Sequence, residues 1–263
     1  MPVNIKAKLI SKEEIIPGIF KFGIKADDII KTAKPGNFIE IKVNNNIEPF
    51  LRRPISIYNM NKEEGILEFI FQVKGKGTQI LSERNVGELI DIIGPLGYGT
   101  FKYENYQNLA IIGGGIGIFP LYELAKLAKN DGKNVNTYLG FRNKQMLMLE
   151  EKFKEVSSKL SITTDDGSYG YKGFAIDLLK EDIERKKIDC IYACGPLPML
   201  KKVQELSIEK NIPCQISLEE RMACGLGACL GCAVKVASSP SKAPEYWHVC
   251  KAGPVFQATD VEI

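Results

Sequence analysis

The stretch NLAIIGGGIGIFPLYELAKLAKN, residues 108–130, decides the fold of the second half of this chain. An apolar run leads into four glycines within five positions, and apolar residues at helical spacing follow. A strand, a glycine turn and a helix in this order open a parallel α/β sheet. A tight turn alone would not need so many glycines. Gly113, Gly114, Gly115 and Gly117 therefore predict a loop whose amides bind a pyrophosphate at the helix N-terminus.

The same alternation continues to residue 219, which predicts a parallel-sheet nucleotide-binding domain over residues 101–218. Further apolar strands are predicted at 134–140, 159–166, 189–195 and 213–219, and helices at 119–130, 144–156, 175–187 and 198–210. The glycine loop departs from the G-x-G-x-x-G fingerprint, because Ile118 stands where its third glycine would be. The next strand closes with Gly140-Phe141-Arg142 instead of an acidic residue, which leaves NADPH open beside NADH.

Residues 1–100 have a different sequence pattern, in which short apolar runs are separated by turn residues. The runs lie at 7–10, 18–24, 37–43, 55–60, 66–73 and 89–94. Many short strands at this spacing predict an antiparallel sandwich or barrel. Residues 219–263 have little periodicity apart from a short strand expected at 232–238, and the Ser- and Pro-rich stretch 238–246 predicts a surface loop.

Four cysteines in the C-terminal stretch carry the most specific chemistry. Cys224, Cys229 and Cys232 have the spacing C-x4-C-x2-C, and Cys250 follows after a long gap. This is the plant-type pattern for a 2Fe-2S cluster, which carries one electron at a time. Small residues between the ligands let backbone N–H groups approach the sulfurs.

Structural zinc and unligated thiols are the alternatives for these cysteines. Zinc sites usually bring their ligands as two close pairs, and only Cys229 and Cys232 form such a pair. The first residues, MPVNIKAKLI, lack the features of a signal peptide, so we expect a cytoplasmic protein with reduced thiols. A zinc-stabilised binding module or a non-catalytic carrier would be the corresponding non-enzyme.

Bulk composition narrows the function further. The net charge of +3 is too small to predict nucleic-acid binding, and no apolar run is long enough to span a membrane. His248 is the only histidine, so catalysis by histidine pairs or triads is nearly excluded. Such a chain must take its chemistry from cofactors.

Two motifs in the first 100 residues suit a flavin. In Arg53-Pro54-Ile55-Ser56 the guanidinium can pair with a phosphate and the hydroxyl can donate toward a ring nitrogen. A sheet edge blunted by proline would explain the same residues. Gly77 and Thr78 could present donors to a pyrophosphate, although the GKGT sequence is also typical of a hairpin turn.

Two motifs end strands of the α/β region, where open sheets bind ligands. Cys194, in CGPLPM, places a small thiol where a nicotinamide could pack, and a buried cysteine before a helix is the alternative. The sequence Asp165-Asp166-Gly167-Ser168 could bond a ribose, or it could be a plain turn.

Taken together, the ordered motifs RPIS, GKGT, GGGIG, TDDGS, CGPLPM and C-x4-C-x2-C…C resemble the ferredoxin-reductase-like flavoproteins. The resemblance extends over essentially the whole chain. Within this group, the chain most resembles the electron-transfer subunits of two-component, NAD-dependent dihydroorotate dehydrogenases. The most specific segments are SLEERMACGLGACLGC (217–232) and VCKAGPVF (249–256). Other flavin oxidoreductase subunits, which serve NAD(P)H and ferredoxin, sulfur or hydrogenase partners, are the alternative.

The resemblance implies three domains: an FAD-binding antiparallel β-barrel (1–100), an NAD-binding α/β domain (101–218) and a small 2Fe-2S module (219–263). It places flavin contacts at Arg53, Pro54, Ile55, Ser56, Ile70, Phe71, Gln72, Gly77 and Thr78, and cluster ligands at Cys224, Cys229, Cys232 and Cys250. It also implies a partner, an FMN-containing catalytic subunit, usually in a heterotetramer with two copies of each chain. The pair would act in pyrimidine biosynthesis.

Two positions depart from the family pattern. Ile55 stands where many ferredoxin reductases have a tyrosine that stacks on the flavin, so no aromatic stacking is expected there. Ala252 replaces an aspartate expected before the glycine of the GPVF segment, which puts the polar contacts of that loop in question.

Overall fold

The computed structural model describes residues 1–263 except 45, 186 and 238–243. The chain forms two units. One contains residues 1–100, 219–233 and 248–254, and the other contains 101–218, 234–247 and 255–263. The predicted boundaries at 100 and 218 are points where the chain passes from one unit to the other. The predicted module 219–263 contributes to both units, and the division into three domains stays a prediction.

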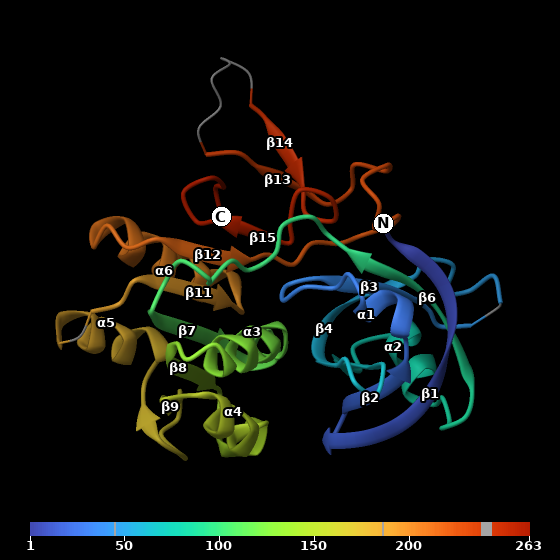
Figure 1. The fold of residues 1–263 in the computed structure, drawn as a ribbon, viewed down its shortest axis with the longest axis horizontal. Coiled ribbons are helices and arrows are strands. Elements are labelled where there is room, and N and C mark those ends of the chain that lie inside the picture. The colour runs from blue at the N-terminus through green and yellow to red at the C-terminus, as the bar shows by residue number, and fades with distance from the viewer. Residues whose placement is uncertain (45, 186, 238–243) are drawn as a thin grey trace. The chain divides into compact units, whose positions relative to one another are not determined.

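A closed six-stranded antiparallel barrel forms the first unit's core, in the order β1-β2-β5-β4-β3-β6 (Figure 1). Its strands are β1 (Val3–Ile16), β2 (Ile19–Lys25), β3 (Phe38–Lys42), β4 (Arg53–Asn61), β5 (Ile66–Gln72) and β6 (Leu89–Leu96). Alternate residues point inward, and the rings of Phe22, Phe69 and Phe71 meet in the interior. The short helices α1 (Asp27–Ile30) and α2 (Lys76–Ser82) complete this part of the unit.

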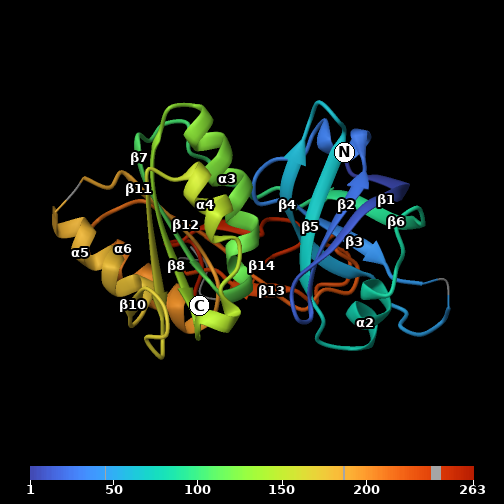
Figure 2. The same cartoon turned by 90° about the horizontal axis from the view of Figure 1, so that it is seen from below.

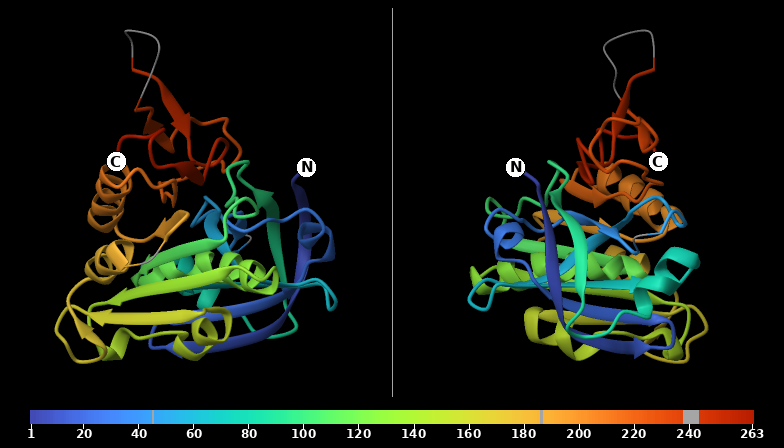
Figure 3. Two further views of the ribbon diagram at one scale, coloured as in Figure 1. Left: turned by 60° about the vertical axis from the view of Figure 1, so that its left-hand side comes forward. Right: turned by 90° about the vertical axis from the view of Figure 1, so that its right-hand side faces the viewer.

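A seven-stranded sheet forms the second unit's core, in the order β10-β9-β8-β7-β11-β12-β15. Its strands are β7 (Asn108–Gly114), β8 (Asn134–Phe141), β9 (Lys159–Thr164), β10 (Tyr171–Lys172), β11 (Cys190–Cys194), β12 (Cys214–Ser217) and β15 (Val255–Gln257). All neighbours are parallel except β12 and β15. Figure 3 shows β8 and β9 running side by side in the same direction.

Helices cover both faces of this sheet. They are α3 (Phe119–Asn130), α4 (Glu150–Val156), α5 (Ala175–Arg185) and α6 (Leu197–Glu209). Figure 2 shows α3 and α4 on one face and α5 and α6 on the other. The 3-10 turns η1 (Gly115–Ile118) and η2 (Lys144–Met146) precede α3 and α4, and β13 (Ala233–Lys235) pairs with β14 (Tyr246–His248) in a separate small sheet. Because helices cover both faces of the sheet, its strands are buried on both sides, which explains why the predicted strands are continuously apolar.

Most predicted elements are confirmed, but the helix predicted over 144–156 is wrong in its first half. Asn143 accepts a hydrogen bond from the amide of Met146 and closes the separate turn η2. Leu147 is extended and Leu149 has a φ of 59°, so α4 begins only at Glu150. Met148 is buried there, which explains how an apolar spacing can persist without a helix.

Two features of the C-terminal stretch bear on the other predictions. The short strand expected at 232–238 is present as β13, whereas β15 was not predicted. Most of the predicted surface loop 238–246 lies outside the described residues, which resume at 244. In the part of the chain that the structure describes, no helix is long and apolar enough to cross a membrane.

The aromatic interior of the barrel should dominate the first unit's stability. Phe69→Ala removes a ring that is 0% exposed and should lower the free energy of unfolding by about 3–5 kcal/mol. Phe50→Ala is the matched control, because its ring is 82% exposed, and it should change stability by less than about 0.5 kcal/mol. Chemical denaturation followed by circular dichroism measures both, and equal effects would contradict this account of the core.

Candidate functional site

The four predicted cluster cysteines meet in the first unit as two pairs. The thiol of Cys224 interacts with that of Cys229, and the thiol of Cys250 interacts with that of Cys232. The amide of Gly227 links the pairs, because it donates to the Cys250 sulfur over 3.1 Å from within the Cys224–Cys229 segment. Cys229 is exposed and Cys224 partly exposed, whereas Cys232 and Cys250 are buried. The arrangement therefore has an outer and an inner pair.

Backbone amides surround the sulfurs. The Cys224 sulfur accepts from the N–H groups of Leu226, Ala228 and Cys229 at 3.3–3.4 Å, and the Cys232 sulfur accepts from the amide of Cys250 at 3.4 Å. Although burial acts to raise it, the pKa of the Cys224 thiol is lowered to about 6 because these amides stabilise the thiolate. Thiolates are the form that ligates metals, so Cys224 is prepared for ligation, whereas burial raises the pKa of the Cys250 thiol to about 12.

A left-handed backbone lets the loop turn its amides toward the sulfurs. Gly225, Gly227 and Leu230 have φ values of 67°, 82° and 61°. Gly225 has a second requirement, since a Cβ there would lie 2.6 Å from the Glu40 side chain of β3. Only glycine meets both demands without strain.

The loop that carries Cys250 is attached to the barrel unit through its backbone. The amides of Tyr98 and Gly99 donate to the carbonyl oxygens of Lys251 and Gly253, at 2.9 and 3.0 Å. Ala252 donates its own amide to the carbonyl oxygen of His248. These contacts use main-chain atoms, so the absence of an aspartate at 252 does not remove them.

The predicted flavin motifs come together at the start of β4. Arg53 lies against Gly77 so closely that a Cβ at 77 would collide with the guanidinium. Gly77 and Thr78 lie in the first turn of α2, so the hairpin interpretation of GKGT is wrong. The Thr78 hydroxyl accepts from the amides of Lys74 and Gly75, which caps this helix.

The remaining flavin candidates divide between the two sides of the barrel wall. The Phe71 ring is in the interior with Phe20 and Phe22, and Ile55 packs against the same interior. Strand alternation then turns Pro54, Ser56, Ile70 and Gln72 outward. A ligand on the outer face could contact these side chains but only the backbone of Phe71. Their contacts with a flavin stay predictions.

The glycine loop and the Cys194 motif are neighbours in the second unit. Strands β7 and β11 are parallel partners, with Gly113 opposite Cys194. A Cβ at Gly117 would lie 2.5–2.6 Å from backbone atoms of Cys194 and Gly195. Close packing therefore accounts for Gly117, whereas Gly115, with a φ of 54°, has open space where a Cβ would point. Cys194 is 1% exposed, and its approach to a nicotinamide stays a prediction.

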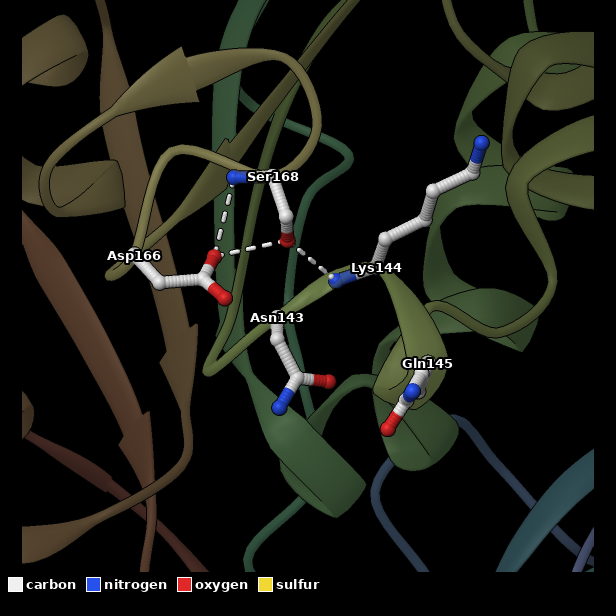
Figure 4. Close-up of a pocket in the computed structure, with 5 residues that line it drawn as sticks. All are labelled: Asn143, Lys144, Gln145, Asp166 and Ser168. Atoms are coloured by element: carbon white, nitrogen blue, oxygen red, sulfur yellow. Dashed lines mark hydrogen bonds between the residues drawn. The ribbon is translucent and has the colours of Figure 1, made fainter.

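A pocket of about 530 Å³ opens where β8 and β9 end (Figure 4). It is lined by Asn143, Lys144, Gln145, Asp166 and Ser168. One Asp166 oxygen accepts from the Ser168 amide at 2.9 Å and hydroxyl at 2.6 Å, and the Ser168 oxygen accepts from the Lys144 amide at 2.8 Å. The two Ser168 donors lower the pKa of Asp166, so the pocket presents a carboxylate. Carboxylates at such strand ends can accept from ribose hydroxyls.

These residues fit the implied groups in three ways. The sulfur set with its amide donors suits an anionic binuclear cluster. Arg53, held beside Gly77, suits a flavin phosphate, and Gly115 with the Asp166 pocket suits a dinucleotide. Across the described ranges, no three or more His, Cys, Asp or Glu side chains are gathered as for a single metal ion.

Sequence reasoning missed Glu40 and the pocket residues Asn143, Lys144 and Gln145. The latter three follow a predicted strand, so their place at a sheet edge could have signalled them. Glu40 lies in the alternating pattern FIEIK, which predicts an ordinary exposed carboxylate. Its burial depends on a loop more than 180 residues away, and no local signal could reveal that.

Comparisons with known proteins agree across the whole chain. Residues 6–103 match the oxidoreductase FAD-binding domain, residues 111–205 the oxidoreductase NAD-binding domain, and residues 219–262 the iron-sulfur cluster binding domain of dihydroorotate dehydrogenase B. The electron transfer subunit of dihydroorotate dehydrogenase B (NAD(+)) from Desulforamulus reducens is 36% identical over 97% of each chain. The Bacillus pumilus subunit of the same name is 39% identical over 97% of this chain and 96% of its own.

A solved structure shares the fold over nearly the same range. It is the NADH-dependent reduced ferredoxin-NADP oxidoreductase, studied for flavin-based electron bifurcation. The TM-score is 0.86 at 34% identity, over 98% of this chain and 90% of the other.

Replacement of Cys250, a buried predicted ligand, tests the cluster site. Cys250→Ser should abolish most of the cluster's visible absorbance, because the buried hydroxyl is a poor iron ligand, while bound flavin is retained. Cys214→Ser is the matched control, since that cysteine is a buried strand residue of the second unit, and it should keep the cluster spectrum. An unchanged cluster spectrum in Cys250→Ser would show that another residue is the ligand.

Proposed function

Because this chain belongs to the family of electron transfer subunits of dihydroorotate dehydrogenase B (NAD(+)), we propose that it passes electrons between NAD(H) and a partner catalytic subunit that contains FMN. The observation that carries the proposal is the amide-lined set of four sulfurs, built against a barrel that matches FAD-binding domains. The complex would contain two copies of each chain and act in pyrimidine biosynthesis.

Three groups would supply the chemistry. When bound, FAD supplies the conversion between a two-electron hydride and single electrons, and the cluster supplies one-electron transfer. The chain's own residues bind and orient these groups. Electron transfer needs no general base from this chain, so the pyrimidine chemistry would belong to the partner.

The barrel residues would hold the flavin. Arg53 would pair with its phosphates, with Gly77 leaving room for the guanidinium. Ser56, on the outward side of β4, would donate its hydroxyl toward the flavin ring. Thr78 would act mainly through the helix turn that it caps, since its hydroxyl is already engaged there.

The α/β residues would hold the dinucleotide. Amides of the loop at Gly115 would face the pyrophosphate, and Asp166 would accept from the adenosine ribose. Cys194, at the end of β11, would lie beneath the nicotinamide. Its burial suits a packing role, because a small soft side chain can support a ring without reacting.

The outer cysteine pair would be the edge where electrons leave. Cys229 is exposed, and the flanking Leu226 and Leu230 are 50% and 61% exposed. Apolar side chains around an exposed redox edge suit a protein partner that excludes water. The loop 222–232 would thus be both a ligand loop and a docking surface. A subunit that serves ferredoxin, sulfur or hydrogenase partners is not favoured, because residues 219–262 match the dihydroorotate dehydrogenase B module.

The isolated chain should show half of the overall reaction. Purified with its cofactors, it should reduce an artificial acceptor with NADH, yet it should not oxidise dihydroorotate, because the base and the pyrimidine site lie in the partner. Adding the catalytic subunit should restore dihydroorotate-dependent reduction of NAD. Turnover of dihydroorotate by the isolated chain would overturn the two-subunit proposal.

Asp166 should set the preference for NADH over NADPH. Its carboxylate would repel a ribose 2′-phosphate, so Asp166→Asn should lower the NADH-to-NADPH ratio of kcat/KM several-fold. Glu151→Gln removes an exposed carboxylate of α4 and should leave the ratio unchanged. A native preference for NADPH would instead assign the dominant role to Arg142.

A further inference from the structure

Glu40 is a buried acid that the proposed function does not use. It lies on β3 with its neighbours Pro54 on β4 and Ile93 on β6, and it is 1% exposed. Neither carboxyl oxygen has a hydrogen-bond partner among the described residues. Its neighbours Ile39 and Ile41 point into the barrel, so the Glu40 side chain points outward.

The cluster loop covers this outward side chain. A Cβ at Gly225 would lie 2.6 Å from both Cγ and Oε1 of Glu40, so the carboxyl packs directly against the residue that follows Cys224. The contact lies within one unit, since residues 1–100 and 219–233 belong together.

The two nearby guanidinium groups do not pair with the Glu40 carboxyl, although Arg52 donates to the Glu40 backbone carbonyl at 3.4 Å. The Arg52 guanidinium donates to the Asp91 carboxylate at 2.6 Å and to the Asp91 carbonyl oxygen at 3.1 Å. Arg53 donates to the carbonyl oxygens of Leu51 and Arg52. The charged or titratable groups that face Glu40 are Arg52, Arg53, Asp91 and Cys224, and neither guanidinium donates a hydrogen bond to the Glu40 carboxyl.

A carboxylate in this position is costly, because burial without hydrogen bonds disfavours the charged form. Burial raises the pKa of Glu40 to about 7, Arg52 acts to lower it, and the neighbouring Cys224 acts to raise it. A glutamine of the same shape would avoid the cost of a charge. An ionised Glu40 places its negative charge directly against the loop that carries Cys224.

We propose that Glu40 is a tuning residue, whose carboxylate, held against Gly225, lowers the reduction potential of the cluster bound by Cys224. The inference rests on the proposed function, because it requires the cluster. A fixed negative charge opposes the addition of an electron, and buried charges are weakly screened. The electron added to the cluster would come from the bound flavin. Glu40 itself is neither oxidised nor reduced.

Glu40→Gln tests the inference, since it removes the charge and keeps the shape. The reduction potential of the cluster is measured by a redox titration followed by electron paramagnetic resonance at pH 8.5. The one-electron reduction equilibrium should shift toward the reduced form on the order of tenfold, about 59 mV more positive. Glu63→Gln, in the exposed turn after β4, is the control and should match the wild type. A Glu40→Gln potential equal to the wild-type value would overturn the inference.

Glu40→Leu provides a second measurement if Glu40→Gln does not fold. It removes the same charge and keeps a side chain of similar size against Gly225, so the cluster potential at pH 8.5 should also shift toward the reduced form on the order of tenfold. A Glu40→Leu potential equal to the wild-type value would overturn the inference. A wild-type protein without cluster absorbance would contradict the proposed function itself, whereas an intact cluster that ignores Glu40 would contradict this inference alone.

Discussion

The hydrogen bonds from backbone amides to the cysteine sulfurs constrain the rest of the functional region. A single sulfur, that of Cys224, takes three amides from the five residues that follow it. So short a loop can turn its N–H groups inward only with left-handed residues, which explains Gly225 and Gly227. Without side chains at these positions the loop can approach the barrel closely. The same feature therefore stabilises the Cys224 thiolate and buries Glu40.

Much of the fold could be predicted because its signals are local. The run 108–114, the glycines and the helix 119–130 have the predicted bounds, since each apolar period is complete within the element. The prediction of a helix from residue 144 was wrong because Asn143 caps a separate turn. The spacing of apolar residues does not show where such a turn interrupts a helix. Strand β15 was missed for another reason: three residues carry almost no period, and pairing with β12 alone defines them.

The candidate site likewise has features that local sequence predicts and features that depend on distant residues. The cysteine spacing and the RPIS and GKGT motifs identify residues that the structure brings together, as the contact of Arg53 with Gly77 shows. Sequence could not tell which side of the barrel wall Phe71 faces, and its ring belongs to the interior. Nor could it separate glycines needed for packing, such as Gly117, from Gly115, which faces open space. These distinctions depend on neighbours from distant parts of the chain.

The C-terminal 45 residues are integral to both units instead of forming an appendage. Residues 219–233 and 248–254 belong with the barrel and carry all four cluster cysteines, whereas 255–263 belong with the sheet and supply β15. In the second unit the Gln204 side chain of α6 donates to the carbonyl oxygens of Ala258 and Val261. Loss of these residues would remove the predicted sulfur ligands from one unit and the antiparallel edge strand from the other. The four predicted cluster cysteines thus belong to the same unit as the predicted flavin residues, and their loop packs against Glu40 of the barrel.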